Sequence, residues 1–397
     1  MNDAWILGAY RSPIGRYGGG LAPLRADDML GELFAALISK TQIDPEDVGE
    51  VYAGCANQAG EDNRNVARMA WLSAGLPYQT PAITVNRLCA SGLDAVISAS
   101  RAIWCGDHDL VVAGGVENMS RAPFVMPKSP KAYGGGNKTV FDSALGWRFP
   151  NPRLEARFPL EGMGETAENI AERYQIAREH QDSFALSSHE KAIEAMEAGR
   201  FKDEIIAMEV PGRKNPVFVD KDEGPRADTT LDKLAGLKAV FRVGGSVTAG
   251  NSSTLNDGAA ALLIGTKAKA KALGLTPMAK IVAAASAGLD PQVMGLGPIY
   301  ATPKAMDKAG IKIGDVDLIE LNEAFAVQAL AVIRELGLDE EKLNVNGGAI
   351  ALGHPLGCSG ARILTTLVHQ MQRQDAAYGL ASLCVGVGQG VSLVVKR

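Results

Sequence analysis

Short apolar runs alternate with amphipathic stretches along the first third of the chain. Four runs have the length and composition of buried strands, at 4–10, 50–54, 82–86 and 109–115. Between them, 26–41 places apolar residues at helical spacing, and 88–106 does the same as far as Gly106, a common helix end. Strands that alternate with helices predict a mostly parallel sheet covered on both faces.

The last third of the chain repeats this order of elements. "IDPEDVGEVYAG" (43–54) matches "IKIGDVDLIELN" (311–322), each with a helix exit, an acidic turn and a strand. "ITVNRLCASG" (83–92) matches "LNVNGGAIALG" (343–353), each with a short strand that ends in Val-Asn. The economical interpretation is a duplicated α/β half.

One uncharged stretch, 376–395, has about the length of a membrane span. Glycines and a glutamine interrupt its middle, at Gly386, Gly388, Gln389 and Gly390. The stretch therefore predicts two buried strands joined by a glycine turn, and we expect no contact with a membrane.

The middle of the chain, from about 121 to 220, is rich in Pro, Gly and charge. It contains one long helical pattern, 165–199, whose break at 174–181 predicts two helices. We interpret this region as a subdomain inserted into the N-terminal half, and long insertions of this kind often line a binding cleft.

Composition narrows the function classes. The chain has 397 residues, 46% hydrophobic and 21% charged, with a formal net charge of −5, which argues against a nucleic-acid binder. An anionic ligand would have to be held by local cations. The five cysteines are widely spaced with no C-x-x-C pair, so neither a disulfide framework nor a zinc site is predicted. A reducing, cytoplasmic location follows, since the N-terminus is not a secretory signal.

Two of the cysteines lie in settings that suit chemistry. Cys89 stands where a strand gives way to a helical pattern, and a helix N-terminus favours the thiolate. Cys384 ends a strand before a glycine turn, whose free N–H groups suit an oxyanion. The alternative for each is an inert buried cysteine. Cys55, Cys105 and Cys358 lack such settings, and we interpret them as structural.

His354 and Asn322 are the polar candidates. His354 lies between Gly353 and Pro355, where the backbone is restrained and can approach another group closely. Asn322 follows a strand and precedes a helix. Taken alone, His354 also fits a tight turn with an incidental imidazole, and Asn322 also fits a helix cap.

Four motifs together resemble the signature blocks of the thiolase family, in the right order and across essentially the whole chain: "NRLCASG" (86–92), "NEAFA" (322–326), "NGGAIALGHPLGCSGAR" (346–362) and "CVGVGQG" (384–390). The resemblance implies the α/β thiolase fold. This fold has two similar βαβαβαββ halves with mixed five-stranded sheets in an α-β-α-β-α layering, plus an inserted loop subdomain.

The resemblance also implies domain boundaries. The N-terminal half is expected at 1–120, completed by about 247–268. The inserted loop subdomain is expected at 121–246, and the C-terminal half at 269–397.

The catalytic roles follow from the resemblance. His354 takes the proton of Cys89, which attacks the 3-oxo carbon of a 3-oxoacyl-CoA. Cys384 protonates the acetyl-CoA enolate that leaves. The N–H groups of Cys89 and Gly386 form one oxyanion hole, and His354 with a water held by Asn322 forms the second.

The resemblance implies coenzyme A as co-substrate, no permanently bound cofactor, no metal, and a homodimer or homotetramer. It points to Arg226, Lys233, Ala249 and Ser253 for the nucleotide side and to Met163, Ala324 and Phe325 for the pantetheine channel. Two positions depart from the acetoacetyl-specific biosynthetic members, which carry His-Met at Gly162-Met163 and serine at Lys233. Lys233 fits either a phosphate contact or an exposed lysine.

Three segments look closest to the thiolases of aromatic-compound breakdown, which cleave 3-oxoadipyl-CoA: 54–70, 121–126 and 146–152. A substrate that ends in a carboxylate calls for a cation, and Arg64, Arg68 and Arg148 are candidates. They fit equally well as partners of Glu61, Asp62 or another subunit.

Other activities stay open from the sequence. A general β-oxidation 3-ketoacyl-CoA thiolase or an acetoacetyl-CoA thiolase is the alternative enzyme. An acyl-CoA-binding thiolase-like protein is the non-enzymatic alternative. A decarboxylating condensing enzyme is disfavoured because Cys384 stands where such enzymes are expected to carry a histidine or asparagine.

Overall fold

Nine strands follow one another across the main sheet of the computed structural model, which describes residues 2–397, in the order β12-β13-β14-β11-β1-β10-β5-β3-β4. The N-terminal half supplies β1 (Ala4–Arg11), β3 (Glu50–Gly54), β4 (Ala82–Val85), β5 (Leu110–Asn118) and β10 (Asn256–Gly265), and the short β2 (Gly15–Arg16) pairs with β10. The C-terminal half supplies β11 (Ala279–Gly288), β12 (Leu318–Leu321), β13 (Tyr378–Val385) and β14 (Gln389–Lys396). The two sets of strands join where β1 pairs antiparallel with β11.

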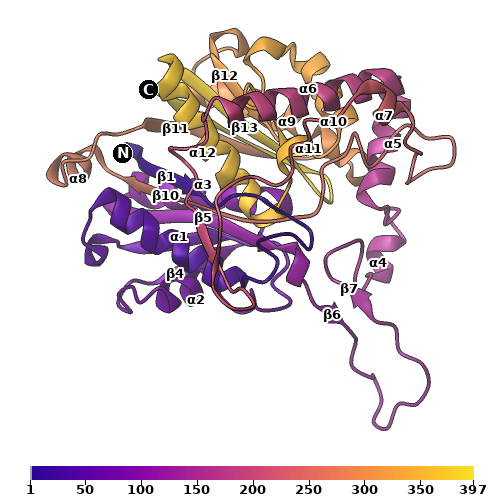
Figure 1. Ribbon diagram of the computed structural model, residues 1–397, viewed down its shortest axis with the longest axis horizontal. Helices are drawn as coiled ribbons and strands as arrows, with labels where there is room; N and C mark the ends of the chain where they lie inside the picture. The colour runs from indigo at the N-terminus through magenta and orange to yellow at the C-terminus, as the bar shows by residue number, and fades with distance from the viewer. Residues whose placement is uncertain (1) are drawn as a thin grey trace.

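Helices cover both faces of each set of strands and produce five layers (Figure 1). α1 (Ala26–Thr41) and α2 (Val66–Ser73) cover the outer face of the N-terminal half. α9 (Gly297–Ala309) and α10 (Ala326–Leu336) cover the outer face of the C-terminal half. α3 (Ser91–Cys105) and α12 (Leu356–Gln374) pack against each other between the two halves. The predicted α-β-α-β-α layering is therefore confirmed.

The innermost layer holds the largest core. Apolar side chains of α3 and α12 meet those of the central strands there, among them Leu93, Val96, Leu364 and Leu367, all nearly inaccessible to solvent. Burial of each such side chain contributes about 1.5–3 kcal/mol. α3 ends at Gly106 in the left-handed conformation (φ 85°), as the sequence predicts. This core fixes the start of α3 against the start of α12.

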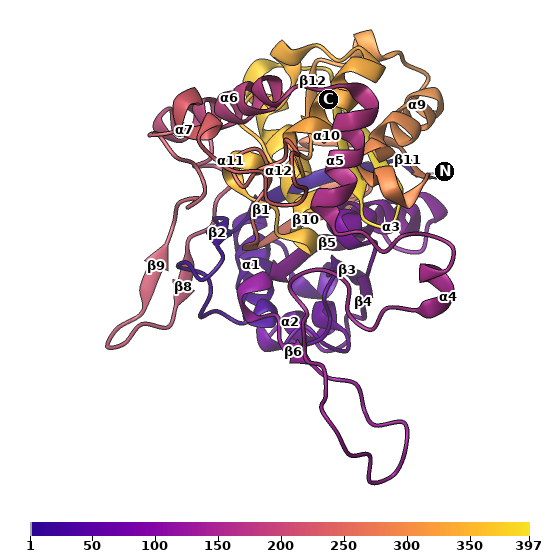
Figure 2. The same cartoon turned by 90° about the vertical axis from the view of Figure 1, so that its right-hand side faces the viewer.

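The middle segment forms the predicted pair of helices, α5 (Met163–Tyr174) and α6 (Arg178–Glu197), with Gln175 in the left-handed conformation at the break. Although the segment is inserted into the N-terminal half, these helices pack on α10 and α11 (Ala349–Leu352) of the C-terminal half. Shorter elements complete it: α4 (Pro152–Glu155), α7 (Leu231–Ala235), and the hairpins β6 (Phe124–Val125) with β7 (Phe141–Asp142) and β8 (Met208–Val210) with β9 (Val217–Val219). Both hairpins extend away from the body (Figure 2).

Two predictions near the C-terminus have different outcomes. The two strands expected within 376–395 are β13 and β14, joined by a tight turn. The strand expected at 343–346 is wrong, because only Leu343 pairs there, in an isolated bridge with Ile319. α8 (Lys267–Ala272) links the two halves.

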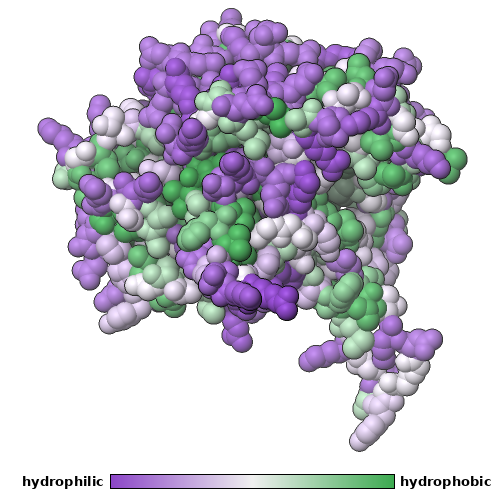
Figure 3. All heavy atoms as spheres, in the orientation of Figure 1, coloured by the Kyte–Doolittle hydropathy of each residue, from purple (hydrophilic) through white to green (hydrophobic). Residues whose placement is uncertain are grey.

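The surface of the face seen in Figure 1 is uneven. Hydrophilic residues cover most of its upper part, and hydrophobic residues gather across its middle (Figure 3). Within residues 2–397, every helix is too short or too polar to cross a membrane.

Candidate active site

Cys89 lies in a 3₁₀ turn, η2 (Leu88–Ala90), between β4 and α3. Leu88 adopts the left-handed conformation (φ 45°), which is strained for a residue with a side chain. Two hydrogen bonds hold it there: its N–H donates to Asn86 Oδ1 at 2.9 Å, and its carbonyl accepts from Ser91 Oγ at 2.6 Å. The turn therefore presents Cys89 in a fixed position at the start of α3.

The Cys89 thiol is neutral at rest. Burial raises its pKa to about 11, although the N–H groups of Gly386 and of Cys89 itself lower it by donating to the sulfur. The expectation that the helix N-terminus would favour the thiolate is therefore wrong in its net effect, because desolvation of the sulfur outweighs these dipoles. A thiol in this state needs a nearby base.

His354 is the candidate for that base, and its imidazole is held in one tautomer. Its Nδ1 lies 2.6 Å from Ser359 Oγ, and the Ser359 hydroxyl donates its single hydrogen to the carbonyl of Pro355 at 2.8 Å. Nδ1 must therefore carry the proton that Ser359 accepts, which leaves a lone pair on Nε2. Burial and the charge of Arg362 lower the pKa of His354 to about 3. The imidazole is thus neutral, with the lone pair of Nε2 free to accept a proton.

The backbone of His354 is fixed as well. Its N–H donates to Asn256 Oδ1 at 2.9 Å, and Asn256 in turn donates to the carbonyl of Gly15 at 2.9 Å. Gly353 has φ 111°, and a Cβ there would come within 2.4 Å of the Asn256 side chain. The glycine before His354 is therefore required by this close approach.

Asn322 connects the histidine to the second cysteine. Its Nδ2 lies 3.4 Å from His354 Nε2, and its backbone N–H donates to the carbonyl of Ser382 in β13 at 2.9 Å. Among the hydrogen bonds of residues 2–397, its buried Oδ1 has no partner. That oxygen is available to a water or a substrate hydrogen.

Cys384 lies at the end of β13, opposite Gly390 of β14. The thiol is buried, and burial together with the nearby Cys89 raises its pKa well above the usual range. The turn that follows contains Val387 at φ 61° and Gly388 at φ 77°. A β-branched residue rarely adopts this conformation, so the turn is strained beside Gly386.

The elements that carry these residues pack together. The 3₁₀ turn η2, which contains Cys89, packs against β13, which contains Cys384, and against α12, which begins two residues after His354. The N–H of Gly386 donates to the Cys89 sulfur. Gly386 lies beside the turn that contains Cys89: a Cβ on Gly386 would lie 3.3 Å from Leu88 Cδ1. All five cysteines are free, and the other three lie in other settings: Cys105 is exposed at the end of α3, whereas Cys55 and Cys358 are buried.

An open cleft of about 590 Å³ contains the residues predicted for the nucleotide side, and Arg226, Lys233, Ala249 and Ser253 all line it. Lys233 donates to the carboxylate of Asp228 at 2.7 Å and is 60% exposed, as expected for a surface lysine.

The predicted channel residues connect this cleft to the thiols. Ser253 donates through its N–H to the carbonyl of Ala324 at 3.0 Å. Phe325 packs edge-on against Phe241 of the cleft, with ring centroids 6.3 Å apart. Met163 has its sulfur 3.5 Å from the position of a Cβ on Gly386.

Sequence reasoning missed most of the residues that line the cleft, including the basic residues Arg16 and His189. The pKa of His189 is lowered to about 4 by burial and by the charges of Arg226 and Arg16, and its Nδ1 accepts from the N–H of Arg226 at 3.2 Å. Two guanidinium groups beside a neutral imidazole give the cleft a positive end, which suits phosphate.

Sequence reasoning also missed Asn256 and Ser359 near His354. The only signal for Ser359 is a hydroxyl five residues after the histidine.

Two of the candidate arginines for a substrate carboxylate donate to main-chain carbonyls. Arg68 donates to those of Thr80 and Tyr78 at 2.5 and 2.7 Å. Arg148 donates to the carbonyls of Ser143 and Asn57 at 2.9 and 3.0 Å.

The acidic neighbours of these arginines have other partners. Glu61 pairs with Arg121 and Arg25 at 2.5 and 3.3 Å, and Asp62 accepts from the N–H groups of Gln58 and Gly60. Arg64 lies in the left-handed conformation (φ 63°) just before α2.

The chain matches the family models "Thiolase, N-terminal domain" over residues 4–268 and "Thiolase, C-terminal domain" over residues 275–397. It is 52% identical to the 3-oxoadipyl-CoA/3-oxo-5,6-dehydrosuberyl-CoA thiolase of Escherichia coli, with 100% of each chain covered. A beta-ketoadipyl-CoA thiolase and an acetyl-CoA acetyltransferase of Pseudomonas aeruginosa are each 51% identical; 100% of this chain is covered in both, with 99% and 100% of the relatives. The crystal structure of the Bacillus anthracis acetyl-CoA acetyltransferase is 43% identical, with a TM-score of 0.95 over 100% of this chain and 99% of that one.

Proposed function

This chain belongs to the thiolase family and is an acyltransferase, and we propose that it cleaves 3-oxoadipyl-CoA with CoA into acetyl-CoA and a four-carbon dicarboxylic acyl-CoA. The observation that supports the acyl-transfer chemistry is the packing of the elements that carry two thiols and a neutral imidazole, with the N–H of Gly386 donating to the Cys89 sulfur. The relatives and the position of Arg148 support the choice of acyl chain.

In the first half-reaction, Nε2 of His354 takes the proton of Cys89, and the thiolate attacks the 3-oxo carbon of the substrate. The C2–C3 bond then breaks, its electron pair passes to the acetyl-CoA enolate, and Cys384 supplies the proton to C2. The N–H groups of Cys89 and Gly386 stabilise the oxyanion on C3. The enolate oxygen is stabilised by His354 and by a water bound to Asn322, in keeping with the family resemblance.

In the second half-reaction, the thiol of CoA gives its proton to the Cys384 thiolate that the first half-reaction leaves, and its sulfur attacks the acyl group on Cys89. Cys89 leaves as a thiolate and recovers its proton from His354. The same steps in the reverse order give the condensation reaction. Each oxyanion donor is expected to contribute about 10²–10³ in rate.

We further propose that CoA lies in the cleft with its phosphates near Arg226 and Arg16 and its pantetheine arm along Ser253, Ala324 and Phe325 toward the thiols. The cleft residues Arg226 and Lys233 and the channel residue Met163 come from 121–246, so we assign the CoA-binding role to this inserted subdomain. The halves at 1–120 with 247–268 and at 269–397 carry the chemistry.

For the acyl end, Arg148 is the candidate we favour. It donates to the carbonyl of Asn57, whose N–H donates to Glu117, and Glu117 accepts from Gly357 just after His354. This chain of contacts runs from Arg148 toward the base. A guanidinium there pairs well with the distal carboxylate of 3-oxoadipyl-CoA. The 3-oxoadipyl-CoA thiolase of Escherichia coli and the beta-ketoadipyl-CoA thiolase of Pseudomonas aeruginosa support the same substrate, and the acetyl-CoA acetyltransferase of Pseudomonas aeruginosa supports the acetoacetyl alternative.

A substrate panel tests this proposal. We expect turnover of 3-oxoadipyl-CoA to exceed that of 3-oxooctanoyl-CoA and acetoacetyl-CoA, with the four-carbon diacid found on Cys89 by mass spectrometry. Arg148→Gln should lower kcat/KM for 3-oxoadipyl-CoA about 10–100-fold, the range for a charge-assisted hydrogen bond, and leave the fatty substrate unchanged. Arg68→Gln is the matched control. A clear preference of the unaltered protein for a fatty chain would reject the proposed substrate.

We also propose a homodimer or homotetramer in a reducing, cytoplasmic location. Apolar side chains of α2 and of the region around the edge strand β4 are exposed, namely Met69, Leu72, Tyr78 and Ile83 at 40–73%. An unpaired strand edge beside such a patch suits a second copy of the chain.

A further inference from the structure

The start of α12 touches the N-terminal half through main chain. A Cβ on Gly357 would lie 2.5 Å from the carbonyl oxygen of Val116 and 2.7 Å from Cα of Cys55. In return, a Cβ on Gly115 would lie 2.0 Å from the carbonyl oxygen of Gly357, and one on Gly92 would lie 2.7 Å from the same oxygen. No side chain fits at this contact, so the helix that follows His354 and the half that carries Cys89 approach to backbone distance.

One buried carboxylate joins the two halves at this contact. Glu117, near the end of β5, is 1% exposed and accepts three main-chain N–H groups: Gly357 at 2.8 Å, Ala56 at 2.9 Å and Asn57 at 3.1 Å. Ala56 and Asn57 follow β3 of the N-terminal half, whereas Gly357 lies in the first turn of α12. N–H groups in a first helical turn have no partner within the helix, and the dipole there favours an anion.

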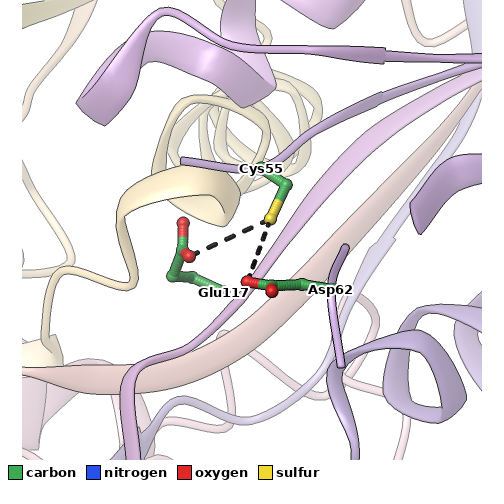
Figure 4. A group of neighbouring side chains, drawn as sticks. All are labelled: Cys55, Asp62 and Glu117. Carbon is green, nitrogen blue, oxygen red and sulfur yellow. Dashed lines mark hydrogen bonds between the residues drawn. The ribbon is translucent and has the colours of Figure 1, made fainter. Parts of the chain in front are cut away.

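Cys55 and Asp62 complete the buried cluster (Figure 4). The Cys55 sulfur lies 3.6 Å from Asp62 Oδ2 and 3.9 Å from Glu117 Oε1, and burial raises the pKa of this thiol, which keeps it protonated. Both carboxylates are engaged by main-chain N–H groups, Asp62 by those of Gln58 and Gly60. A metal ion in this cluster would have to displace those bonds, so the three side chains act as an anchor for the loop after β3.

We propose that Glu117 is a positioning residue for the acyl-transfer reaction: its carboxylate fixes the first turn of α12, three residues after His354, to the half that carries Cys89. Ser359, which holds the imidazole, lies in the same turn. A displacement of about 1 Å between a base and its nucleophile costs about 10²-fold in rate. The inference rests on the proposed roles of Cys89 and His354 but not on the acyl chain.

Glu117 also acts on Cys89 through its charge. Burial raises the pKa of Glu117 to about 7, so the carboxylate is mostly ionised at pH 8, and its charge is one of the causes that raise the pKa of Cys89. Removing the charge favours the thiolate, while weakening the bonds of residue 117 to the main chain misplaces the base. Slow alkylation of the free thiol depends on the thiolate fraction, whereas turnover also needs the base in position, so the two effects move alkylation and turnover in opposite directions.

The test compares Glu117→Gln with Asp62→Asn at pH 8, using whichever 3-oxoacyl-CoA the protein turns over best. The Asp62 variant removes a charge from the same cluster but leaves the bond to Gly357. In Glu117→Gln, the amide NH₂ that replaces one carboxylate oxygen faces main-chain N–H groups and cannot accept from them. We therefore expect kcat to fall 30- to 100-fold with KM for CoA within twofold. Alkylation of Cys89 by iodoacetamide should be as fast as in the unaltered protein or faster. Hydrogen exchange should quicken at 353–360 in this variant only.

Two results would overturn the proposal: kcat of Glu117→Gln within twofold of the unaltered protein, or a fall in kcat and in alkylation by the same factor. If Glu117→Gln does not fold, Glu117→Asp provides the test. It keeps the charge but withdraws the oxygens from Gly357, so kcat should fall while alkylation stays unchanged. Equal loss of both in Glu117→Asp would count against positioning. Because each ratio is taken on one substrate, a wrong acyl-chain assignment leaves the result intact.

Discussion

The two halves share one scheme but close the open edge of their sheets differently. In the N-terminal half, β3 pairs with β4 over four residues, Val51–Gly54 with Ala82–Val85. In the C-terminal half, the corresponding strand β12 pairs with β13 on one side, and its outer edge has only the bridge from Ile319 to Leu343. The side-chain amide of Asn344 then takes the place of the missing strand: it accepts from the N–H of Leu321 and donates to its carbonyl, both at 2.9 Å.

This difference in strand pairing determines how each half positions its reactive group. The N-terminal half runs from a paired strand into a 3₁₀ turn and presents Cys89 rigidly. The C-terminal half leaves its strand after one residue, with Asn344 at φ 43°. The free loop is then fixed by Glu323, which accepts from Asn344 Nδ2 at 2.7 Å, Ser188 Oγ at 2.7 Å and the N–H of Ile350 at 3.1 Å. In place of a paired strand, the C-terminal half therefore has a loop after Leu343, and this loop leads to His354.

The largest expected effect distinguishes the role of Cys384 in the C-terminal half from that of Cys89 in the N-terminal half. Cys384→Ala should lower carbon–carbon cleavage about 10³-fold, because general acid catalysis typically contributes 10²–10⁴. Acylation of Cys89 by acetyl-CoA should persist, whereas Cys89→Ala should abolish both. Steady-state cleavage and mass spectrometry of the acyl-enzyme measure the two steps. Normal cleavage by Cys384→Ala would remove Cys384 from the mechanism.

The sequence predicts most of this architecture but not its contacts. The helix at 26–41, the match of 43–54 to 311–322 and the two terminal strands all follow from hydrophobic spacing, which depends on neighbours in the chain. The strand expected at 343–346 is wrong because a side chain replaces it, and a pattern of apolar residues does not reveal that.

The missed contacts of the site are long-range. Glu117 and Gly357 are 240 positions apart, and their bond exists only because glycines let the backbones meet. The state of Cys89 was also out of reach: the helix dipole is visible in the sequence, but the degree of desolvation that overrides it is set by packing.

The next largest effect concerns the tautomer of His354, which Ser359 fixes in the C-terminal half. Ser359→Ala removes the acceptor of the Nδ1 proton, so His354 redistributes between tautomers and kcat should fall about tenfold. Ser100→Ala in α3 is the matched control. Its hydroxyl also donates to a carbonyl one helical turn back, that of Val96 at 2.7 Å, but it does not contact an imidazole. A loss of the same size in both variants would mean that helix packing, not the tautomer, is responsible.

The side-chain amide of Asn344, which replaces the missing strand, should contribute to the free energy of unfolding. Asn344→Ala leaves the N–H and the carbonyl of Leu321 without partners, and each buried unsatisfied group costs about 1–3 kcal/mol. We expect the free energy of unfolding to fall by about 3 kcal/mol in urea denaturation. Asn63→Ala in the N-terminal half, where the side chain is exposed, should change it by less than about 0.5 kcal/mol. Similar values for the two variants would show that the edge of β12 does not need this amide.

Buried groups of the two halves should move stability with pH in opposite directions. The pKa of Glu117 rises from 4.5 to about 7 on folding, so its contribution is present at low pH and is lost as the pH rises through that window. The pKa of His354 falls from 6.5 to about 3, so its contribution is present above pH 6.5 and is lost as the pH falls. The Tm difference between the unaltered protein and Glu117→Gln should shrink from pH 5 to pH 8, and that for His354→Asn should shrink from pH 7 to pH 4. Parallel pH trends for the two variants would contradict this assignment.

The smallest effect concerns strain beside Gly386. Val387 adopts φ 61°, which costs a β-branched residue of order 1–3 kcal/mol, whereas glycine adopts it freely but gains about 0.5–1 kcal/mol of unfolded-state entropy. Val387→Gly should therefore stabilise the protein by about 0.5–1 kcal/mol. Turnover should stay within twofold, because pairing of Val385 with Gln389 still fixes the turn. The corresponding change in the N-terminal half, Leu88→Gly, relieves similar strain but removes a side chain that packs against the central core, so it should destabilise. Thermal unfolding of both variants would test this contrast, and a lower Tm for Val387→Gly would mean that the valine side chain contributes more in its contacts than its conformation costs.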